Sequence, residues 1–76
     1  EIDLERISLA DRINEIMDSL ALRRDMTFAE LMGEQITRQR IVYTFLAVLE
    51  LMKLRMIRVY QAASFAAIRI FIVGEE

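Results

Sequence analysis

The stretch from Ile41 to Leu54 has the strongest hydrophobic pattern in the chain, with apolar residues three and four positions apart as on a buried amphipathic helix. One side of this helix is predicted to face the core, and it carries Ile41, Val42, Phe45, Val48, Leu49 and Met52. A second apolar stripe, on the other side, consists of Tyr43, Ala47, Leu51 and Leu54. Because a small domain has one core, a helix that is apolar on two sides lies between two layers or meets another molecule.

Two shorter helices are predicted before this one. The first runs from about Leu9 to Leu20 or Leu22, with Ser8 placed to accept a backbone N–H of the first turn. Its apolar stripe consists of Leu9, Ile13, Ile16, Met17 and Leu20. The second begins after Thr27, which is spaced with Glu30 as in a capping box, and Gly33 is suited to end it with a positive φ. The residues between these helices, 23–25, are predicted to form a loop.

The long helix is predicted to begin after Thr37 and to end near Leu54 or Arg55. Arg38 and Arg40 lie at its N-terminus, where each cation opposes the helix dipole by about 0.3–1 kcal/mol. Their charge is offset either by nearby carboxylates, Glu30 and Glu34, or by an acidic group on a partner. These two interpretations stay open at the level of the sequence.

Two β-strands are predicted after the long helix. In the first, Ile57 and Val59 alternate with Arg58 and Tyr60, and Ala62 to Ser64 form a turn. The second strand, Phe65 to Val73, places Ile68, Ile70 and Ile72 on one face and Ala67, Arg69 and Phe71 on the other. Three helices followed by a two-stranded hairpin predict an α+β, mainly α, winged helix. Residues 1–76 are interpreted as one domain, with 1–7 as a lead-in segment at the end of a linker from a longer protein.

Composition restricts the possible functions. Of 76 residues, 55% are hydrophobic, which leaves apolar surface for a partner after the core is built. The chain has no cysteine and no histidine, so thiol nucleophiles, the usual general base and the commonest metal ligands are missing. We therefore expect no enzymatic activity, no cofactor, no metal and no small-molecule substrate. The five methionines are predicted to fill gaps in the core.

The charge of the chain argues against a dominant role in binding phosphates. Ten basic and twelve acidic residues give a net charge of −2, whereas nucleic-acid binding draws on excess Lys and Arg. A nucleic-acid-binding winged helix remains the alternative function, because several arginines are available. No apolar run approaches the roughly 20 residues of a membrane span. The absence of cysteine makes a reducing compartment, the cytoplasm, the simplest location.

Three pieces of the sequence together resemble a known family. They are Phe28, Glu30, Leu31 and Gly33 (F-x-E-L with a following Gly), Thr44 to Leu51 (T-F-L-A-V-L-E-L), and the hairpin from Ile57 to Ile72. In this order they resemble the C-terminal domain of bacterial segregation and condensation protein A, the kleisin subunit of the SMC condensin complex. With the first helix they cover Ser8 to Ile72. The family often has Gly after the long helix, where this chain has Arg55, and a left-handed Arg costs about 1 kcal/mol relative to Gly.

The resemblance implies a non-enzymatic adaptor in chromosome condensation and segregation, in the cytoplasm at the nucleoid. Kleisins of this family join the two ATPase heads of an SMC dimer, and the C-terminal winged helix docks on one head and helps to close the ring. A central region of the full-length protein recruits a second winged-helix subunit, ScpB-like. DNA contact is then indirect or weak, and homodimerisation of the isolated domain is a fair expectation.

Two surfaces are candidates for the docking site. The second stripe of the long helix, Tyr43, Ala47, Leu51 and Leu54, can anchor an interface, with Arg40, Thr44, Glu50 and Arg55 as its polar rim. Under this hypothesis Leu51→Glu weakens docking and leaves the fold intact. The hairpin offers Tyr60, Arg69 and Phe71, or a strand edge. The alternative is that the stripe is covered by Ile2 and Leu4 or packs beneath the hairpin.

Overall fold

The first helix begins at the cap that the sequence predicts. The structure is a computed structural model that describes residues 8–74, so the lead-in expected over 1–7 lies outside the described residues. α1 spans Leu9–Arg23, and the Ser8 hydroxyl accepts the backbone N–H of Asp11 at 3.0 Å. The N–H of Arg24 makes the last hydrogen bond of the helix, to the Leu20 carbonyl, and the φ of 73° at Arg24 then turns the chain out of the helix.

α2, Phe28–Met32, has the predicted capping box in full. The Thr27 hydroxyl accepts the Glu30 N–H at 3.0 Å, and the Glu30 carboxylate accepts the Thr27 N–H at 2.9 Å. The second of these hydrogen bonds, helped by Arg23 at 3.3 Å, lowers the pKa of Glu30. Gly33 ends the helix with the predicted positive φ, 77°, and a ψ of −156° that side chains with a Cβ rarely reach.

α3, Arg38–Lys53, is capped by Thr37, whose hydroxyl accepts the Arg40 N–H at 3.1 Å. At its other end the N–H of Met56 donates to the Leu51 carbonyl at 2.9 Å and that of Arg55 to the Met52 carbonyl at 3.0 Å. This is a Schellman motif, which requires a positive φ at Arg55, and the observed value is 64°. Arg55 therefore has the left-handed conformation to which Gly is better suited.

The sheet has one strand more than the predicted hairpin. β2, Ile57–Gln61, and β3, Ile68–Ile72, form the antiparallel wing, and β1, Asp25–Thr27, pairs with the other edge of β3 in the order β1-β3-β2. The prediction of a loop at residues 23–25 was therefore wrong at Arg23, which ends α1, and at Asp25. In β1 Met26 lies opposite Ile70, and both side chains are buried, so core contact stabilises a strand that is too short to show a period of two. The fold is a winged helix in which the wing gains this third strand.

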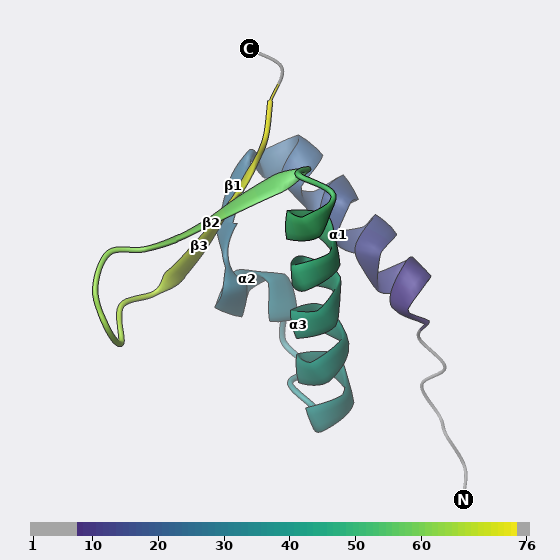
Figure 1. Cartoon of the computed structure of the whole chain (residues 1–76). Helices are drawn as coiled ribbons and strands as arrows, with labels where there is room; N and C mark the ends of the chain where they lie inside the picture. The colour runs from purple at the N-terminus through teal and green to yellow at the C-terminus, as the bar shows by residue number, and fades with distance from the viewer. Residues whose placement is uncertain (1–7, 75–76) are drawn as a thin grey trace, which may run out of the picture.

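The core lies between the helices and the inner face of the sheet. Figure 1 shows the helices on one side of the sheet and the β2–β3 loop extending away from them. The core side chains come from all three helices and all three strands. They are Ile16, Leu20, Met26, Leu31, Ala47, Val48, Leu51, Ile57 and Ile70. No helix in residues 8–74 has the length and apolar character needed to cross a membrane.

A buried arginine joins the three helices. Arg12 is 4% exposed, and its Nε donates to Thr44 Oγ1 at 2.9 Å, while its two Nη atoms donate to Glu15 Oε1 at 2.6 Å and to the Leu31 carbonyl at 2.5 Å. Thr44 is fully buried. All the polar atoms of this cluster therefore have partners, as burial of a guanidinium requires.

Candidate partner-binding surface

The two apolar sides of α3 have opposite roles to those predicted. Its inner face, Thr44, Ala47, Val48 and Leu51, is buried, and Thr44, Ala47 and Leu51 have no exposed surface at all. Its outer face is exposed to between 40% and 54% per side chain. The residues of the outer face are Ile41, Val42, Phe45, Leu46, Leu49 and Met52. Except for Val48, the residues assigned to the core from the sequence therefore lie outside.

Side-chain size explains this inversion. α1 packs directly against α3, and two helices approach closely where the facing side chains are small. Thr44 and Ala47 are small enough for that contact, whereas Ile41 and Phe45 are not. Hydrophobicity alone favours the face with the larger side chains, and it therefore selected the wrong one.

The outer face of α3 borders a hollow of about 270 Å³ whose lining is entirely apolar. Phe45, Leu49 and Met52 contribute to it from the outer face and Val48 from the inner face, and the start of α2 and the wing supply the rest. The full lining is Phe28, Phe45, Val48, Leu49, Met52, Val59 and Ile68. The exposed helix face and the wing thus form one groove, which we call the apolar groove. Met52 is 41% exposed here and does not fill a core gap, whereas Met26 and Met32 are buried as expected for most of the methionines.

The residues predicted from the second stripe do not form one surface. Ala47 and Leu51 are core residues, which overturns their prediction as exposed docking anchors, and Thr44, predicted in the polar rim, binds Arg12 inside. Tyr43 is half-buried, and Leu54 is 54% exposed beyond the end of the helix. Whether Tyr43 and Leu54 contact a partner stays a prediction.

Arg40 has a partner within the domain. Its Nη2 and Nε donate to the Met32 carbonyl at 3.0 and 3.3 Å, so the guanidinium satisfies the C-terminal end of α2. The sequence suggested Glu30 or Glu34 as the group that offsets the charge of Arg40. The structure instead gives Arg40 a backbone carbonyl, and Glu30 pairs with Arg23. A role of Arg40 at an interface stays a prediction.

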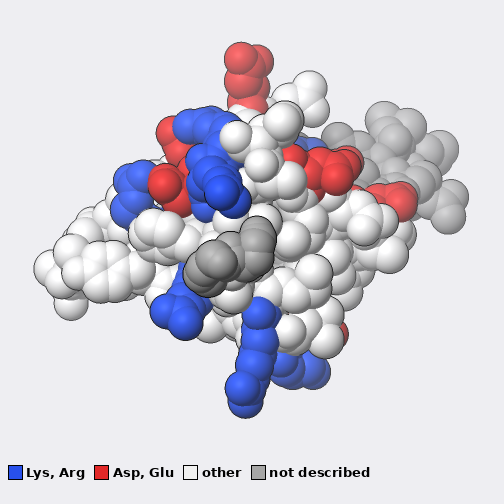
Figure 2. All heavy atoms as spheres, turned by 90° about the horizontal axis from the view of Figure 1, so that it is seen from above, with Lys and Arg blue, Asp and Glu red and all other residues white. Residues whose placement is uncertain are grey.

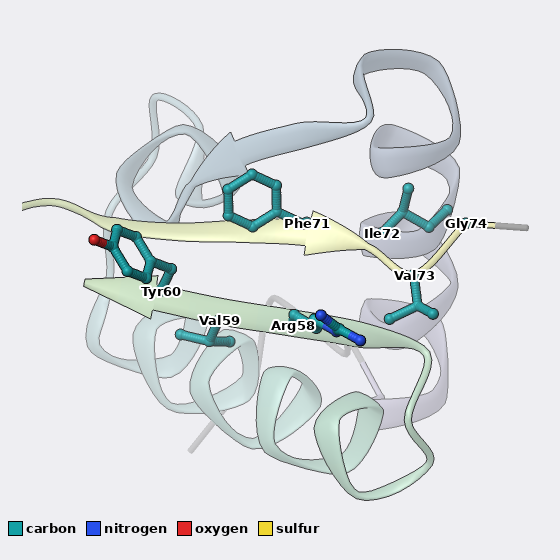
Figure 3. Close-up of a pocket in the computed structure, with 7 residues that line it drawn as sticks. All are labelled: Arg58, Val59, Tyr60, Phe71, Ile72, Val73 and Gly74. Atoms are coloured by element: carbon teal, nitrogen blue, oxygen red, sulfur yellow. The ribbon is translucent and has the colours of Figure 1, made fainter. Parts of the chain in front are cut away.

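The wing residues predicted as a site do lie together. Figure 3 shows the rings of Tyr60 and Phe71 and the Arg58 side chain on neighbouring strands of the wing, where they line a hollow of about 570 Å³. Tyr60 is 59% exposed and Phe71 is half-buried. On the same face Arg69 pairs with Asp25 of β1 at 2.8 Å. This outer sheet face is more polar than the apolar groove, and it is the second candidate surface.

Sequence reasoning missed Arg12 and the true outer face. Arg12 lies four positions before Ile16 and eight before Leu20, within the buried stripe of α1, and that spacing was the available signal. The residues 8–74 contain no cluster of three or more acidic, His or Cys side chains that could hold a metal ion.

A family model described as "Segregation and condensation protein ScpA" matches residues 1–73. The chain belongs to this ScpA family. Among relatives named segregation and condensation protein A, it is 42% identical to the protein of Listeria innocua over 99% of this chain and 30% of that protein. It is 40% identical to the Myxococcus xanthus protein over 80% of this chain and 22% of that protein, and 28% identical to the Clostridium tetani protein over 90% and 27%.

Membership of the ScpA family confirms the resemblance seen in the sequence. The chain spans less than a third of the length of these relatives, so it corresponds to one part of an ScpA protein. Its most specific block, Thr44 to Leu51, contributes Thr44, Ala47 and Leu51 to the inner face of α3 and Phe45 and Leu49 to the outer face. This block is therefore divided between the core and an exposed surface.

Proposed function

We propose that this domain is a non-enzymatic adaptor of chromosome condensation and segregation, which docks on the ATPase head of an SMC dimer and helps to close the SMC–kleisin ring. The names of the ScpA family and of its relatives support the role in segregation and condensation. The exposed apolar surface of α3 supports docking on a protein. The full-length protein would act in the cytoplasm at the nucleoid and would also bind an ScpB-like winged-helix subunit.

The observation that carries the proposal is the outer face of α3. Six aliphatic and aromatic side chains are exposed on one helix of a domain whose core is already complete. Contiguous apolar surface of this kind is typical of a protein interface, in which a desolvated centre supplies most of the binding energy. Docking would bury Phe45, Leu49 and Met52 against the partner.

The same face argues against the alternative, a nucleic-acid-binding winged helix. In DNA-binding members of this architecture the outer face of the equivalent helix lies in the major groove and hydrogen-bonds to base edges. Here that face presents Ile41, Phe45 and Leu49, which have no hydrogen-bonding side-chain groups. The net charge of −2 adds to this argument.

Isothermal titration of the domain with the SMC ATPase head, at low and at high salt, tests the proposal. Leu49→Glu places a carboxylate in the apolar groove and should weaken head binding at least about 30-fold, as at an interface hot spot. Leu22→Glu is the matched control, because Leu22 is 85% exposed on α1 and away from the groove. Duplex DNA serves as the parallel titrant.

Docking through α3 is supported if head binding persists at high salt, is lost in Leu49→Glu and is kept in Leu22→Glu. Absence of head binding together with salt-sensitive DNA binding would overturn the proposal in favour of the alternative. Sedimentation of the free domain in the same buffers measures whether it forms the homodimer expected from the sequence.

A further inference from the structure

A second hollow adjoins the apolar groove at the C-terminal end of α3. It has a volume of about 320 Å³ and is lined by Met52, Arg55, Ile57, Arg58 and Val73. Met52 lines both hollows, so the outer face of α3 continues without a break into this second one. The apolar surface therefore reaches two arginines, of which Arg58 also lines the hollow on the outer sheet face.

Four of the eight arginines in residues 8–74 have a side-chain partner, and these two belong to the other four. Arg12, Arg23, Arg40 and Arg69 each have a carboxylate or carbonyl partner. Arg55 and Arg58, both exposed, have no side-chain hydrogen bond or ion pair with any residue of 8–74. Two guanidinium groups at one edge of an apolar surface are thus available to an outside anion.

The segment that carries them is basic along the sequence. Residues 51–74 contain Lys53, Arg55, Arg58 and Arg69 but no Asp or Glu. Lys53 lies 3.7 Å from Glu50, and both side chains are exposed enough for water to weaken that pair. Figure 2 shows that Lys and Arg side chains protrude at its lower edge with hardly any red atoms, while both colours mix at its upper edge.

We propose that the outer face of α3 binds an amphipathic segment of the partner protein whose apolar side chains fill the apolar groove and whose carboxylates pair with Arg55 and Arg58. This inference rests on the proposed function and adds the chemistry of the partner surface. Arginine binds carboxylates through two parallel N–H···O bonds, which fix the direction in which the segment lies along α3. The apolar contacts supply affinity, and the arginines supply register and orientation.

A protein segment fits this surface better than a nucleic acid does. The two arginines adjoin Met52, Ile57 and Val73, and a backbone of phosphates would leave those side chains and the whole apolar groove in water. A protein segment that carries a carboxylate beside apolar side chains can pair with the arginines and cover the apolar groove at the same time. The flexible Met52 side chain at the junction can adjust to the shape of the bound segment.

The test is a titration of the SMC head with Arg55→Gln, with Arg58→Gln and with the double variant, at low salt and at 1 M salt, where charge pairs are screened. We expect the double variant to bind about tenfold or more weakly at low salt, with the difference shrinking at high salt. Arg58→Lys keeps the positive charge and should therefore bind the head more tightly than Arg58→Gln does. Arg24→Gln is the matched control, because Arg24 is an exposed, positive-φ arginine at the end of α1.

Each outcome distinguishes the inference from the proposed function. If Leu49→Glu abolishes head binding but the arginine variants bind normally, docking stands and the carboxylate contact is overturned. If the wild-type domain fails to bind the head, the proposed function fails first. If the arginine variants lose duplex DNA and keep the head, the anion is phosphate. If the arginine effect vanishes in a Glu75→Gln/Glu76→Gln background, the chain's own carboxylates, not the partner's, account for it, and the inference is again overturned.

Discussion

The inner and outer faces of α3 both carry apolar residues, and they perform different tasks. The inner face combines small side chains, Thr44 and Ala47, with Leu51, and it meets α1 closely enough to exclude all solvent from these residues. The outer face carries larger side chains, such as Phe45 and Leu49, that no other element of residues 8–74 covers fully. The comparison shows that size at a helix crossing, more than hydrophobicity, decides which face becomes the core.

Leu49 and Leu51, on opposite faces of α3, should differ most in how their substitution changes the free energy of unfolding. Leu51→Glu buries a carboxylate where no partner exists and should lower the free energy of unfolding by about 4 kcal/mol or more, enough to unfold a domain of this size. Leu49→Glu should change it by less than about 1 kcal/mol, because that side chain is 44% exposed. Urea unfolding followed by circular dichroism measures both.

This pair also tests the assignment of the two faces. The sequence alone led to the opposite expectation for Leu51→Glu, a folded protein with weakened docking, and the buried position of Leu51 replaces that expectation with unfolding. A folded Leu51→Glu together with an unfolded Leu49→Glu would show that the helix is rotated from the orientation described here.

Local hydrogen-bond patterns made much of the fold predictable. The caps at Ser8, Thr27 and Thr37 each depend on a hydroxyl and an N–H three residues apart, which a sequence shows directly. The alternation of the wing likewise placed Ile57 and Ile70 on the buried face of the sheet.

Features that depend on contacts between distant residues were not predictable in the same way. Both faces of α3 are apolar, and the choice between them depends on α1, which ends at Arg23, well before α3 begins at Arg38. β1 has three residues and exists because Met26 pairs with Ile70. Of the seven predicted site residues, Tyr60 and Phe71 share a surface, while Ala47 and Leu51 are inside because burial of a helix face requires its tertiary neighbour.

The polar part of the inner face should have an intermediate effect on stability. Thr44→Val keeps the shape of the side chain but removes the acceptor of Arg12 Nε, which leaves a buried donor unpaired and should cost about 1–3 kcal/mol. Arg12→Met should also destabilise, since Thr44 and the Leu31 carbonyl lose their donor. The double variant should lose less unfolding free energy than the two single variants lose together, and the difference should be about 0.5–3 kcal/mol. Simple additivity in urea unfolding would show that the Arg12–Thr44 contact does not stabilise the inner face.

The smallest expected effect is at Arg55, where the outer face ends. Its φ of 64° is strained for any residue with a Cβ, so Arg55→Gly should raise the free energy of unfolding by about 1 kcal/mol. Arg55→Ala is the control, because it removes the charge but keeps the strain and should bring no such gain. If Arg55 binds a partner carboxylate, Arg55→Gly will also weaken docking while it stabilises the fold. Equal unfolding midpoints for the Gly and Ala variants would contradict the strain argument. A Gly variant that is more stable but docks normally would support the strain argument and show that Arg55 is not part of the interface. Binding would then not explain why a strained arginine occupies this position.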